Sequence, residues 1–390
     1  MLLLFTMSLM GILLVFIGYP MLLLVLAKAR PNPHLIDARN TPKVVLIVAC
    51  HNPGELLQRK IDNSLALDYP LDKFSLLIVS DGSNDGTADR LQQLGSTQVR
   101  GIALEPHDGK AAALNVAIEQ ATGEAATDIL VFSDVDADLP PATLRSLVRH
   151  FADSSIGGVC GQRVLTRGQA ALHEAQASYV SWDSRIKVLE SRIGSTTSND
   201  GKLYALRREA AGPIADGVTD DLYAALGVIG RGWRFIFDPD AQARVPTPAK
   251  SAQHEISRRR RVVSRSLRGI YLRRSLLNPF RYGFYAIALL VNKILRRLLP
   301  LLLILLLITS LGLAADSLLF ALLAALQMLV YGLAIASALD WNLPGPLGTI
   351  SMRAHYALLG MLGTFLGTWD FLRGRTVTTW RPIKDQPIPR

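Results

Sequence analysis

Charged residues are scarce in this chain of 390 residues: they make up 19% of it, whereas hydrophobic residues make up 49%. A soluble globular protein usually carries about 25% charged residues. Three stretches hold no charged residue at all, namely Met1–Ala27, Leu298–Ala315 and Leu318–Leu339. A helix needs about 20 apolar residues to cross the hydrocarbon core of a bilayer. The missing charge therefore argues against a soluble protein and predicts membrane-spanning helices.

The first uncharged stretch also lacks the basic start and the small-residue cleavage site of a secretory signal peptide. We therefore interpret residues 1–27 as a retained N-terminal transmembrane anchor. Lys28, Arg30, Arg39 and Lys43 follow it directly. Because positive residues stay on the cytosolic side, we expect the region after the anchor to be cytosolic.

Cysteine is almost absent, since only Cys50 and Cys160 occur, both within apolar stretches. Two such residues predict reduced thiols in a core and not a disulfide framework. The net charge is +10, but much of it lies at membrane flanks and in the arginine-rich segment Arg258–Arg274. Basic residues are not interleaved with aromatic ones as in a nucleic-acid groove. We expect no nucleic-acid partner, and contacts with membrane lipids instead.

Residues 28–281 have an ordinary composition and are long enough for one large domain. Apolar runs alternate with helical segments, which predicts an α/β fold with a mostly parallel sheet. The expected strands are Val44–Cys50, Phe74–Ser80, Val99–Leu104, Ile129–Ser133, Gly157–Leu165, Leu203–Leu206 and Arg234–Phe237. The expected helices are Leu56–Leu67, Lys110–Ala121, Gln169–Ile193 and Asp220–Ile229. No internal repeat is found.

Polar residues follow several of these strands. Ligands of parallel sheets bind beyond the carboxyl ends of the strands, so we expect Asn52, Asp81 and Asp134 to converge on one crevice. Asp134 and Asp136 stand one residue apart after Ile129–Ser133, and two such carboxylates can hold a hard divalent cation. Ordinary turn formation is the alternative. An EF-hand is excluded, because its Gly and Glu positions hold Leu139 and Arg145.

Two further polar positions remain ambiguous on spacing alone. Asp81 starts the turn-rich segment Asp81–Thr87, so by itself it indicates a strand-to-helix turn. The motif D-x-D, formed by Asp134 and Asp136 about fifty residues further on, favours contact between Asp81 and a nucleotide. Lys110 follows Gly109 without the other residues of a P-loop. Two roles remain open for Lys110: contact with a phosphate at the start of a helix, or a solvated position on the helix surface.

The second half of the domain holds candidate acid–base and anion-binding residues. Asp220 and Asp221 start an expected helix, where the helix dipole favours carboxylates; the alternative is a general base. Arg258–Arg261 is a run of four arginines. These arginines would either contact anionic lipid head groups or bind a departing diphosphate through bidentate hydrogen bonds from their guanidinium groups.

The C-terminal part is expected to hold three segments. In residues 282–297 Asn292, Lys293, Arg296 and Arg297 share one helix face, which predicts an interfacial amphipathic helix. Residues 298–372 would form a C-terminal transmembrane region and residues 373–390 a cytosolic tail. For Ala354–Trp369 a re-entrant, an interfacial and a spanning arrangement all remain open.

Seven motifs occur in a fixed order: VACHN, IVSDGSNDGT, KAAALNVAI, FSDVDADLPP, NDGKLYALRRE, TDDLYAALGVIGRGW and RRRRV. Together with the apolar flanks and the closing Val377–Trp380, they resemble the membrane-embedded members of glycosyltransferase family 2, such as cellulose, hyaluronan and poly-N-acetylglucosamine synthases. The resemblance covers nearly the whole chain. It implies a cytosolic GT-A-type, nucleotide-sugar-binding domain with flanking transmembrane and interfacial helices, in a multi-pass protein of the cell (inner) membrane.

The resemblance also implies an activity, namely metal-dependent inverting transfer of a hexose. The donor would be a nucleoside-diphosphate sugar, with a UDP-sugar favoured, and the cation Mg²⁺ or Mn²⁺. The acceptor would be a growing cell-surface polysaccharide or a lipid-linked sugar.

Site roles follow from the same resemblance. Asp221 would be the base, with Asp220 in the place of the family's Glu. Asp136 and Asp134 would bind the cation. The donor and its nucleotide would be bound by Asn52, Asp81, Lys110, Asp134, Arg258 and Arg261.

Three residues depart from the family pattern. Val262 stands where the family has Trp, Pro53 where many relatives have Glu, and Lys202 where a smaller residue is usual. The loss of the Trp weakens the inference of a processive synthase. Transfer of a single sugar to a lipid carrier or glycolipid therefore stays open, as does a non-catalytic membrane subunit.

Overall fold

The computed structural model describes residues 1–94, 97–123, 127–166, 170–246, 251–341 and 343–375, and side chains are described outside 170–179. The chain folds into two compact units made of interleaved segments. Among the described residues, the sheet unit comprises His34–Val164 and Asn199–Val245, and the helical unit comprises Met1–Pro33, Leu165–Ser198 and the chain between Pro246 and Arg375. The expected motif Val377–Trp380 lies outside the described residues.

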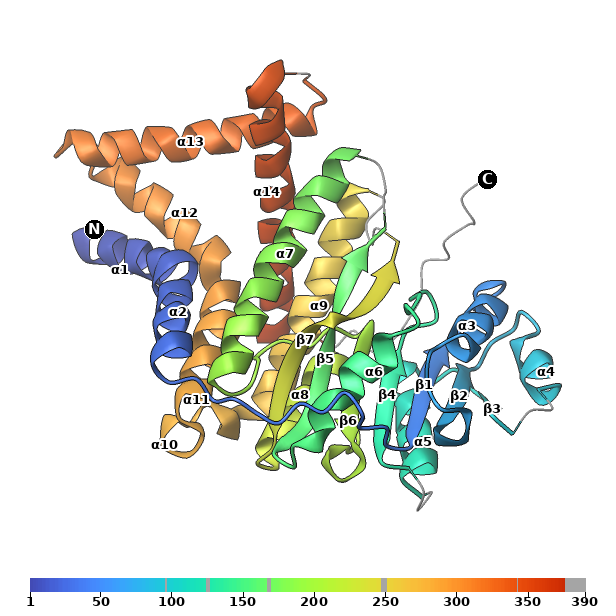
Figure 1. Cartoon of the computed structure of the whole chain (residues 1–390). Coiled ribbons are helices and arrows are strands. Elements are labelled where there is room, and N and C mark those ends of the chain that lie inside the picture. Colours follow the sequence, from blue (N-terminus) through green and yellow to red (C-terminus); the bar gives the residue numbers. More distant parts are fainter. Residues whose placement is uncertain (95–96, 124–126, 167–169, 247–250, 342, 376–390) are drawn as a thin grey trace. The chain divides into compact units, whose positions relative to one another are not determined.

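The sheet unit is built on one seven-stranded sheet with the order β3–β2–β1–β4–β6–β5–β7 (Figure 1). The strands are β1 (Val44–Cys50), β2 (Phe74–Asp81), β3 (Val99–Leu104), β4 (Ile129–Ser133), β5 (Ile156–Leu165), β6 (Leu203–Arg207) and β7 (Arg234–Val245). β1 pairs in parallel with β2 and β4, and β2 pairs in parallel with β3. β6 is antiparallel to both β4 and β5. The predicted α/β fold with a mostly parallel sheet is confirmed.

Local sequence explains the sheet well except at one edge. Every residue of β1 and β4 is buried, as expected for continuous apolar strands in the middle of a sheet. β7 continues to Val245, well past the Phe237 that the sequence indicated. Pro239 lies inside it and is exposed. Because β7 is an edge strand, a residue without an N–H is tolerated there.

Helices connect the strands of this unit. They are α3 (Leu56–Leu65), α4 (Thr87–Gln92), α5 (Lys110–Gly123), α6 (Thr143–Val148) and α8 (Asp220–Gly230), with short 3-10 turns at Leu71–Lys73, Arg149–Ala152 and Arg208–Ala210. α5 packs against β1 and β2. Its small buried residues Ala113, Ala117 and Ala121 recur every four positions, which is the spacing of one helix face. The start of α5 is thereby held close to the ends of the central strands.

The helical unit contains the apolar segments. Its elements are α1 (Leu2–Leu13), a π-turn (Leu14–Gly18), α2 (Tyr19–Ala29), α7 (Ala170–Ile193), α9 (Ala252–Leu272), a 3-10 turn (Arg274–Leu277), α10 (Pro279–Tyr282), α11 (Phe284–Leu289), a π-segment (Leu290–Leu295), α12 (Arg296–Gly312), α13 (Leu318–Ala338) and α14 (Gly345–Leu372). Three stretches of the described chain are long and apolar enough to cross a membrane, Leu2–Ala29, Phe284–Gly312 and Leu318–Ala338. α7 and α9, which the sequence analysis assigned to domain 28–281, group with these helices.

The segment 282–297, expected as a separate interfacial helix, is not separate. The helix starts at Phe284, after Gly283 with φ 54, and continues through the π-segment to Gly312. The charges at its centre are satisfied within the unit, since Arg297 donates to the hydroxyl of Ser266 and to the carbonyl of Lys293 (2.7 Å). The amphipathic part and the apolar part therefore form one helix of 29 residues. An interfacial position of its first half stays a prediction.

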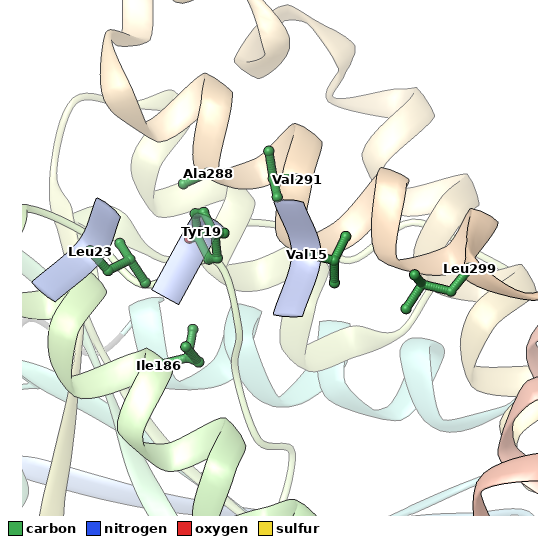
Figure 2. Packing of buried hydrophobic residues seen from close by; sticks show 7 residues of the cluster. All are labelled: Val15, Tyr19, Leu23, Ile186, Ala288, Val291 and Leu299. Carbon is green, nitrogen blue, oxygen red and sulfur yellow. The ribbon is translucent and has the colours of Figure 1, made fainter. Parts of the chain in front are cut away.

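A hydrophobic cluster ties the N-terminal helix into the helical unit (Figure 2). Val15, Tyr19 and Leu23 recur every fourth residue on one helix face. They pack with Ile186 of α7 and with Ala288, Val291 and Leu299 of the helix Phe284–Gly312.

A buried acid lies beside this cluster. The carboxylate of Glu190 on α7 is only 2% exposed. It accepts hydrogen bonds from the hydroxyls of Tyr19 and Thr197 and from the amide of Asn292 (3.1 Å). A buried charge is tolerated only when its oxygens are paired in this way. Glu190 thus links three helical segments by polar contacts.

Candidate functional site

The loop after β1 is tied to the loop after β2. The backbone N–H of Asn52 donates to Ser83 Oγ (2.9 Å), and Asn52 Oδ1 accepts from the N–H of Asn84 (2.8 Å). Asn52 itself has φ 50, a left-handed conformation that Asn adopts more readily than most residues. These bonds bring the predicted donor-binding residue Asn52 to the carboxyl edge of the sheet, where it shapes the loop.

Asp81, the last residue of β2, is fully buried. Its Oδ1 accepts from the N–H of Asp108 (3.0 Å), and its Oδ2 accepts from the N–H of Gly109 (2.9 Å) and lies 2.8 Å from His107 Nδ1. The next residue, Gly82, has φ 58, and a Cβ there would lie 2.6 Å from the His107 nitrogen. Asp81 therefore orders the loop that leads into α5. Its predicted contact with a nucleobase stays a prediction.

Lys110, the first residue of α5, does not lie on a solvated face. Its Nζ is 2.8 Å from Asp134 Oδ1 and 2.8 Å from Asp220 Oδ2. Burial alone would lower the pKa of Lys110, but these two carboxylates raise it well above its ordinary value. The ammonium is therefore a fixed positive charge between β4 and α8.

The pair Asp134 and Asp136 meets a second lysine. Lys202 Nζ lies 2.7 and 2.8 Å from the two oxygens of Asp136 and 3.0 Å from Asp134 Oδ2. Burial alone would raise the pKa of Asp134, but the ammonium groups of Lys110 and Lys202 lower it well below its ordinary range. We call Asp134, Asp136, Asp220, Lys110 and Lys202 the acid–lysine cluster.

A third lysine, Lys60, stabilises the chain at the end of β4. Lys60 of α3 is 1% exposed. Its Nζ donates to Ser133 Oγ (2.8 Å) and to the carbonyl of Ala137 (2.6 Å), and burial lowers its pKa to about 8. These bonds hold both sides of the segment that carries Asp134 and Asp136.

Asp221 stands next to the acid–lysine cluster at the start of α8. Its Oδ1 accepts from the N–H of Leu222 (2.7 Å), and its carbonyl accepts from the side chain of Asn199 (2.9 Å). Burial, and then the negative charge of Asp220, raise the pKa of Asp221 to about 7. A carboxyl group with a pKa near neutrality is suited to proton abstraction at physiological pH.

Residues 45–215 match the sequence family described as Glycosyl transferase family 2. They form a glycosyltransferase family 2 domain. The match begins in β1 and includes Asn52, Asp81, Lys110, Asp134 and Asp136. The expected family is therefore confirmed for this part of the chain.

Curated relatives of this chain differ in the products that their names state. A poly-beta-1,6-N-acetyl-D-glucosamine synthase of Staphylococcus aureus (strain COL) is 26% identical over 211 residues, which are 53% of this chain and 50% of that protein. A beta-monoglucosyldiacylglycerol synthase of Synechocystis sp. is 28% identical over 254 residues, 60% of this chain and 51% of that protein. The chain spans about half the length of these relatives.

A solved structure is similar to this chain in fold. The mannosyltransferase of Pyrobaculum calidifontis in complex with GDP-Man and Mn²⁺ matches with a TM-score of 0.68 and 24% identity, over 95% of this chain and 99% of that one. This likeness supports the expected GT-A-type fold.

Two features of the candidate site were not predicted from the sequence. Lys202 was noted only for its size, whereas it contacts both aspartates of the D-x-D. The hydroxyl of Tyr204 is buried and has no hydrogen-bond partner among the residues that the structure describes, and burial, followed by the charge of Asp220, raises its pKa well above the ordinary value. Neither feature could be found without knowing that β6 pairs with β4.

The predicted diphosphate-binding arginines belong to the helical unit. Arg258 Nη2 lies 2.9 Å from Glu255 Oε1, and Arg259 Nε lies 2.6 Å from the same oxygen. Glu255 is fully buried. Burial, and then the charge of Arg258, lower the pKa of Arg261. The structure thus gives Arg258 a carboxylate partner within α9, and the roles of both arginines toward a diphosphate stay predictions.

The residues that would hold a divalent cation in the glycosyltransferase domain are few. Among the described residues no group of three or more His, Cys, Asp or Glu side chains could hold a metal ion. Asp134 and Asp136 do offer oxygen ligands, which Mg²⁺ and Mn²⁺ prefer. The buried, unpartnered hydroxyl of Tyr204 belongs to β6, two residues after Lys202, and indicates that the site is completed by another polar group. The residues fit a cation that takes its remaining ligands from a donor or from water.

Proposed function

We propose that this protein is an inverting membrane glycosyltransferase that moves a sugar from a nucleoside-diphosphate sugar to a growing cell-surface polysaccharide. The observation that carries the proposal is the position of Asp221. Its carboxyl group, with a pKa raised to about 7, directly follows Asp220, which Lys110 links to the D-x-D aspartate Asp134. The proposed base and the proposed anion-binding strand end thus lie in one sheet unit, most of which matches a transferase family.

The chemistry follows from charge and proton accounting. Asp221 accepts the proton of an acceptor hydroxyl, whose oxygen then attacks the anomeric carbon of the donor. The bond between that carbon and the diphosphate breaks on the opposite face, so the configuration inverts. The departing diphosphate gains negative charge, and the fixed ammonium of Lys110 stabilises it in a partly buried site where such charges act strongly.

A divalent cation belongs to the same proposal. Asp136 and Asp134 would hold Mg²⁺ or Mn²⁺, which when bound neutralises charge on the diphosphate as a Lewis acid. The Mn²⁺ and GDP-Man named for the mannosyltransferase of similar fold support a divalent metal and a nucleotide-sugar donor. We retain a UDP-sugar as the favoured donor class.

The second candidate is transfer of one sugar to a lipid carrier or glycolipid. Val262, on α9, stands where the motif of the family that the sequence resembles has Trp, and Val262 is 41% exposed. One curated relative is named as a synthase of a polysaccharide and the other as a synthase of a glycolipid. Product length separates the two candidates, since a ladder of products supports polymer synthesis and one added sugar supports the alternative.

The three apolar stretches support a membrane protein. We propose the inner membrane of the cell as its location, with the sheet unit in the cytosol. Protease protection of the sheet unit in right-side-out vesicles, and its cleavage in inverted vesicles, would support this topology.

Release of nucleoside diphosphate tests the activity. The purified chain in nanodiscs is incubated with a panel of nucleotide sugars, Mg²⁺ or Mn²⁺ and membrane lipid extract. Asp221→Asn removes the base, and Asp72→Asn, an exposed carboxylate in the turn before β2, is the matched control. Release by the wild type and Asp72→Asn, but not by Asp221→Asn, supports the proposal. Equal release by all three proteins would refute Asp221 as the base. Release from no donor, or cellular function that survives Asp221→Asn, favours a non-catalytic subunit.

A further inference from the structure

Lys202 occupies the space between the two carboxylates expected to bind a cation. Its Nζ lies 2.7 to 3.0 Å from three of the four carboxylate oxygens of Asp134 and Asp136. The side chains of the three residues are 22%, 25% and 31% exposed. The contact is therefore partly shielded from water, and an ion pair of this kind is stronger than one on an open surface.

Strand pairing fixes the backbone position of Lys202 beside Asp134. β6 runs antiparallel to β4, with Leu203 opposite Ser133, so Lys202 and Asp134 each stand one residue outside that pair. Ser133 Oγ donates to the carbonyl of Lys202 (3.1 Å), and the N–H of Lys202 donates to Asp200 Oδ1 (3.2 Å). The lysine is thus held beside the D-x-D by sheet register and not by a chance surface contact.

An ammonium and a divalent cation cannot share these oxygens. Mg²⁺ takes oxygen ligands at about 2.0–2.1 Å, so an ion held by both carboxylates would need the space between them that the Lys202 ammonium occupies. Two positive charges at such a distance would also repel each other strongly. The lysine has a flexible four-carbon stem with a charge that pairs with phosphate, so it can move away from the carboxylates and still find an anionic partner.

We propose that Lys202 is the resident counter-ion of Asp134 and Asp136, which a divalent cation has to displace, so that metal binding depends on the nucleotide. A diphosphate supplies both oxygen ligands for the metal and an anionic partner for the displaced ammonium. The metal therefore binds weakly to the free protein and tightly together with the nucleotide. This inference rests on the proposed function, because it assumes a cation at the D-x-D.

The test measures Mn²⁺ binding directly, without turnover. The full chain in nanodiscs is titrated with Mn²⁺ and free ion is followed by electron paramagnetic resonance. Lys202→Met removes the charge and keeps the length of the side chain. Without nucleotide it should bind Mn²⁺ about 10- to 100-fold more tightly than the wild type, the range over which groups beside metal ligands change affinity. Lys73→Met is the matched control, since Lys73 lies before β2 and donates to Thr41 Oγ1; its Mn²⁺ affinity should equal that of the wild type.

Two further variants separate the counter-ion role from general effects. Lys202→Arg keeps a positive charge and should bind Mn²⁺ as weakly as the wild type. The double variant Asp136→Asn/Lys202→Met should not show the tighter Mn²⁺ binding of Lys202→Met, because one metal ligand is removed. If Lys202→Met does not fold, as judged by circular dichroism, Lys202→Gln is used in its place. Equal Mn²⁺ affinity of the wild type and the neutral variant would overturn the inference.

Nucleotide dependence provides the second readout, with UDP and GDP as probes. Either diphosphate that binds should raise the Mn²⁺ affinity of the wild type by a larger factor than that of Lys202→Met, because binding energies at two linked sites change together. Equal factors in the two proteins would refute the linkage. Tighter Mn²⁺ binding by Lys202→Met without sugar transfer from any donor would uphold the counter-ion role and count against the transferase. Sugar transfer by the wild type, together with equal Mn²⁺ affinities of the wild type and Lys202→Met, would support the transferase and overturn the counter-ion role.

Discussion

The ammonium of Lys110 lies 2.8 Å from a carboxylate oxygen of Asp220, although the two residues start different helices of the sheet unit, α5 and α8. The same ammonium is 2.8 Å from Asp134. It therefore connects the D-x-D at the end of β4 with the helix start that carries Asp221. Removal of this one charge should affect donor binding and proton transfer together.

Lys110→Met is expected to lower kcat/KM by about 10²- to 10³-fold, the loss typical of removing one group that stabilises charge in the transition state. The variant also leaves Asp134 and Asp220 without their shared partner. Lys110→Arg, which keeps the charge, should retain more activity, and Lys73→Met should behave like the wild type. Initial rates of nucleoside diphosphate release check this. A loss below about threefold would show that Lys110 has no role in the reaction.

The pH dependence of transfer should report the ionisation of Asp221. Because a base must be deprotonated and its pKa is raised to about 7, kcat/KM should rise with pH up to about 7 and level off above it. Asp220→Asn removes the charge that contributes to the raised pKa of Asp221, while burial remains. The acid limb of the kcat/KM profile of Asp220→Asn should therefore move to lower pH. The move should be smaller than the whole shift in the pKa of Asp221, because burial still raises that pKa. Profiles of the wild type, Asp220→Asn and Asp72→Asn measure this, and an unmoved limb in Asp220→Asn would contradict it.

Asp81→Ala should destabilise the sheet unit. The substitution leaves the N–H groups of Asp108 and Gly109 without their buried acceptor. An unsatisfied buried group costs about 1–3 kcal/mol, so the midpoint of thermal unfolding should fall by roughly 5–10 °C. Asp72→Ala, at an exposed position, is the control and should change the midpoint little. A midpoint for Asp81→Ala equal to that of the control would show that the loop is ordered by other contacts.

Glu255→Gln should destabilise the helical unit and alter its acid sensitivity. Burial alone would raise the pKa of Glu255, but Arg258 and Arg259 lower it below its ordinary value. A lowered folded-state pKa stabilises the fold above the pKa of the unfolded state, and this contribution disappears as pH falls through the folded-state value. Breaking such a buried pair costs about 3–5 kcal/mol.

Thermal unfolding between neutral and acidic pH measures this effect. The wild type should lose stability below the ordinary carboxyl range, whereas Glu255→Gln should be less stable at neutral pH and lose less on acidification. Glu119→Gln, at an exposed position on α5, is the control. Parallel curves for the wild type and Glu255→Gln would argue against a stabilising role of the buried carboxylate.

Local sequence determined most of the sheet unit and the ends of its strands. β1 and β4 are continuous apolar runs, and a short run of this kind that is rich in β-branched residues is typical of a buried strand. Asn52, Asp81 and Asp134 each stand at or just after the end of a parallel strand, and parallel strands bring such ends to one edge. Their approach to a common edge of the sheet was therefore predictable from periodicity and position.

Tertiary structure decided which charges meet and which helices group together. Lys202 contacts Asp136 across 66 positions of the chain, and only the antiparallel pairing of β6 with β4 brings them together. α7 and α9 contain many charged and polar residues, yet they group with the apolar helices. Strand pairing and helix packing join segments distant in sequence, so these relationships are set by long-range contacts and not by local pattern.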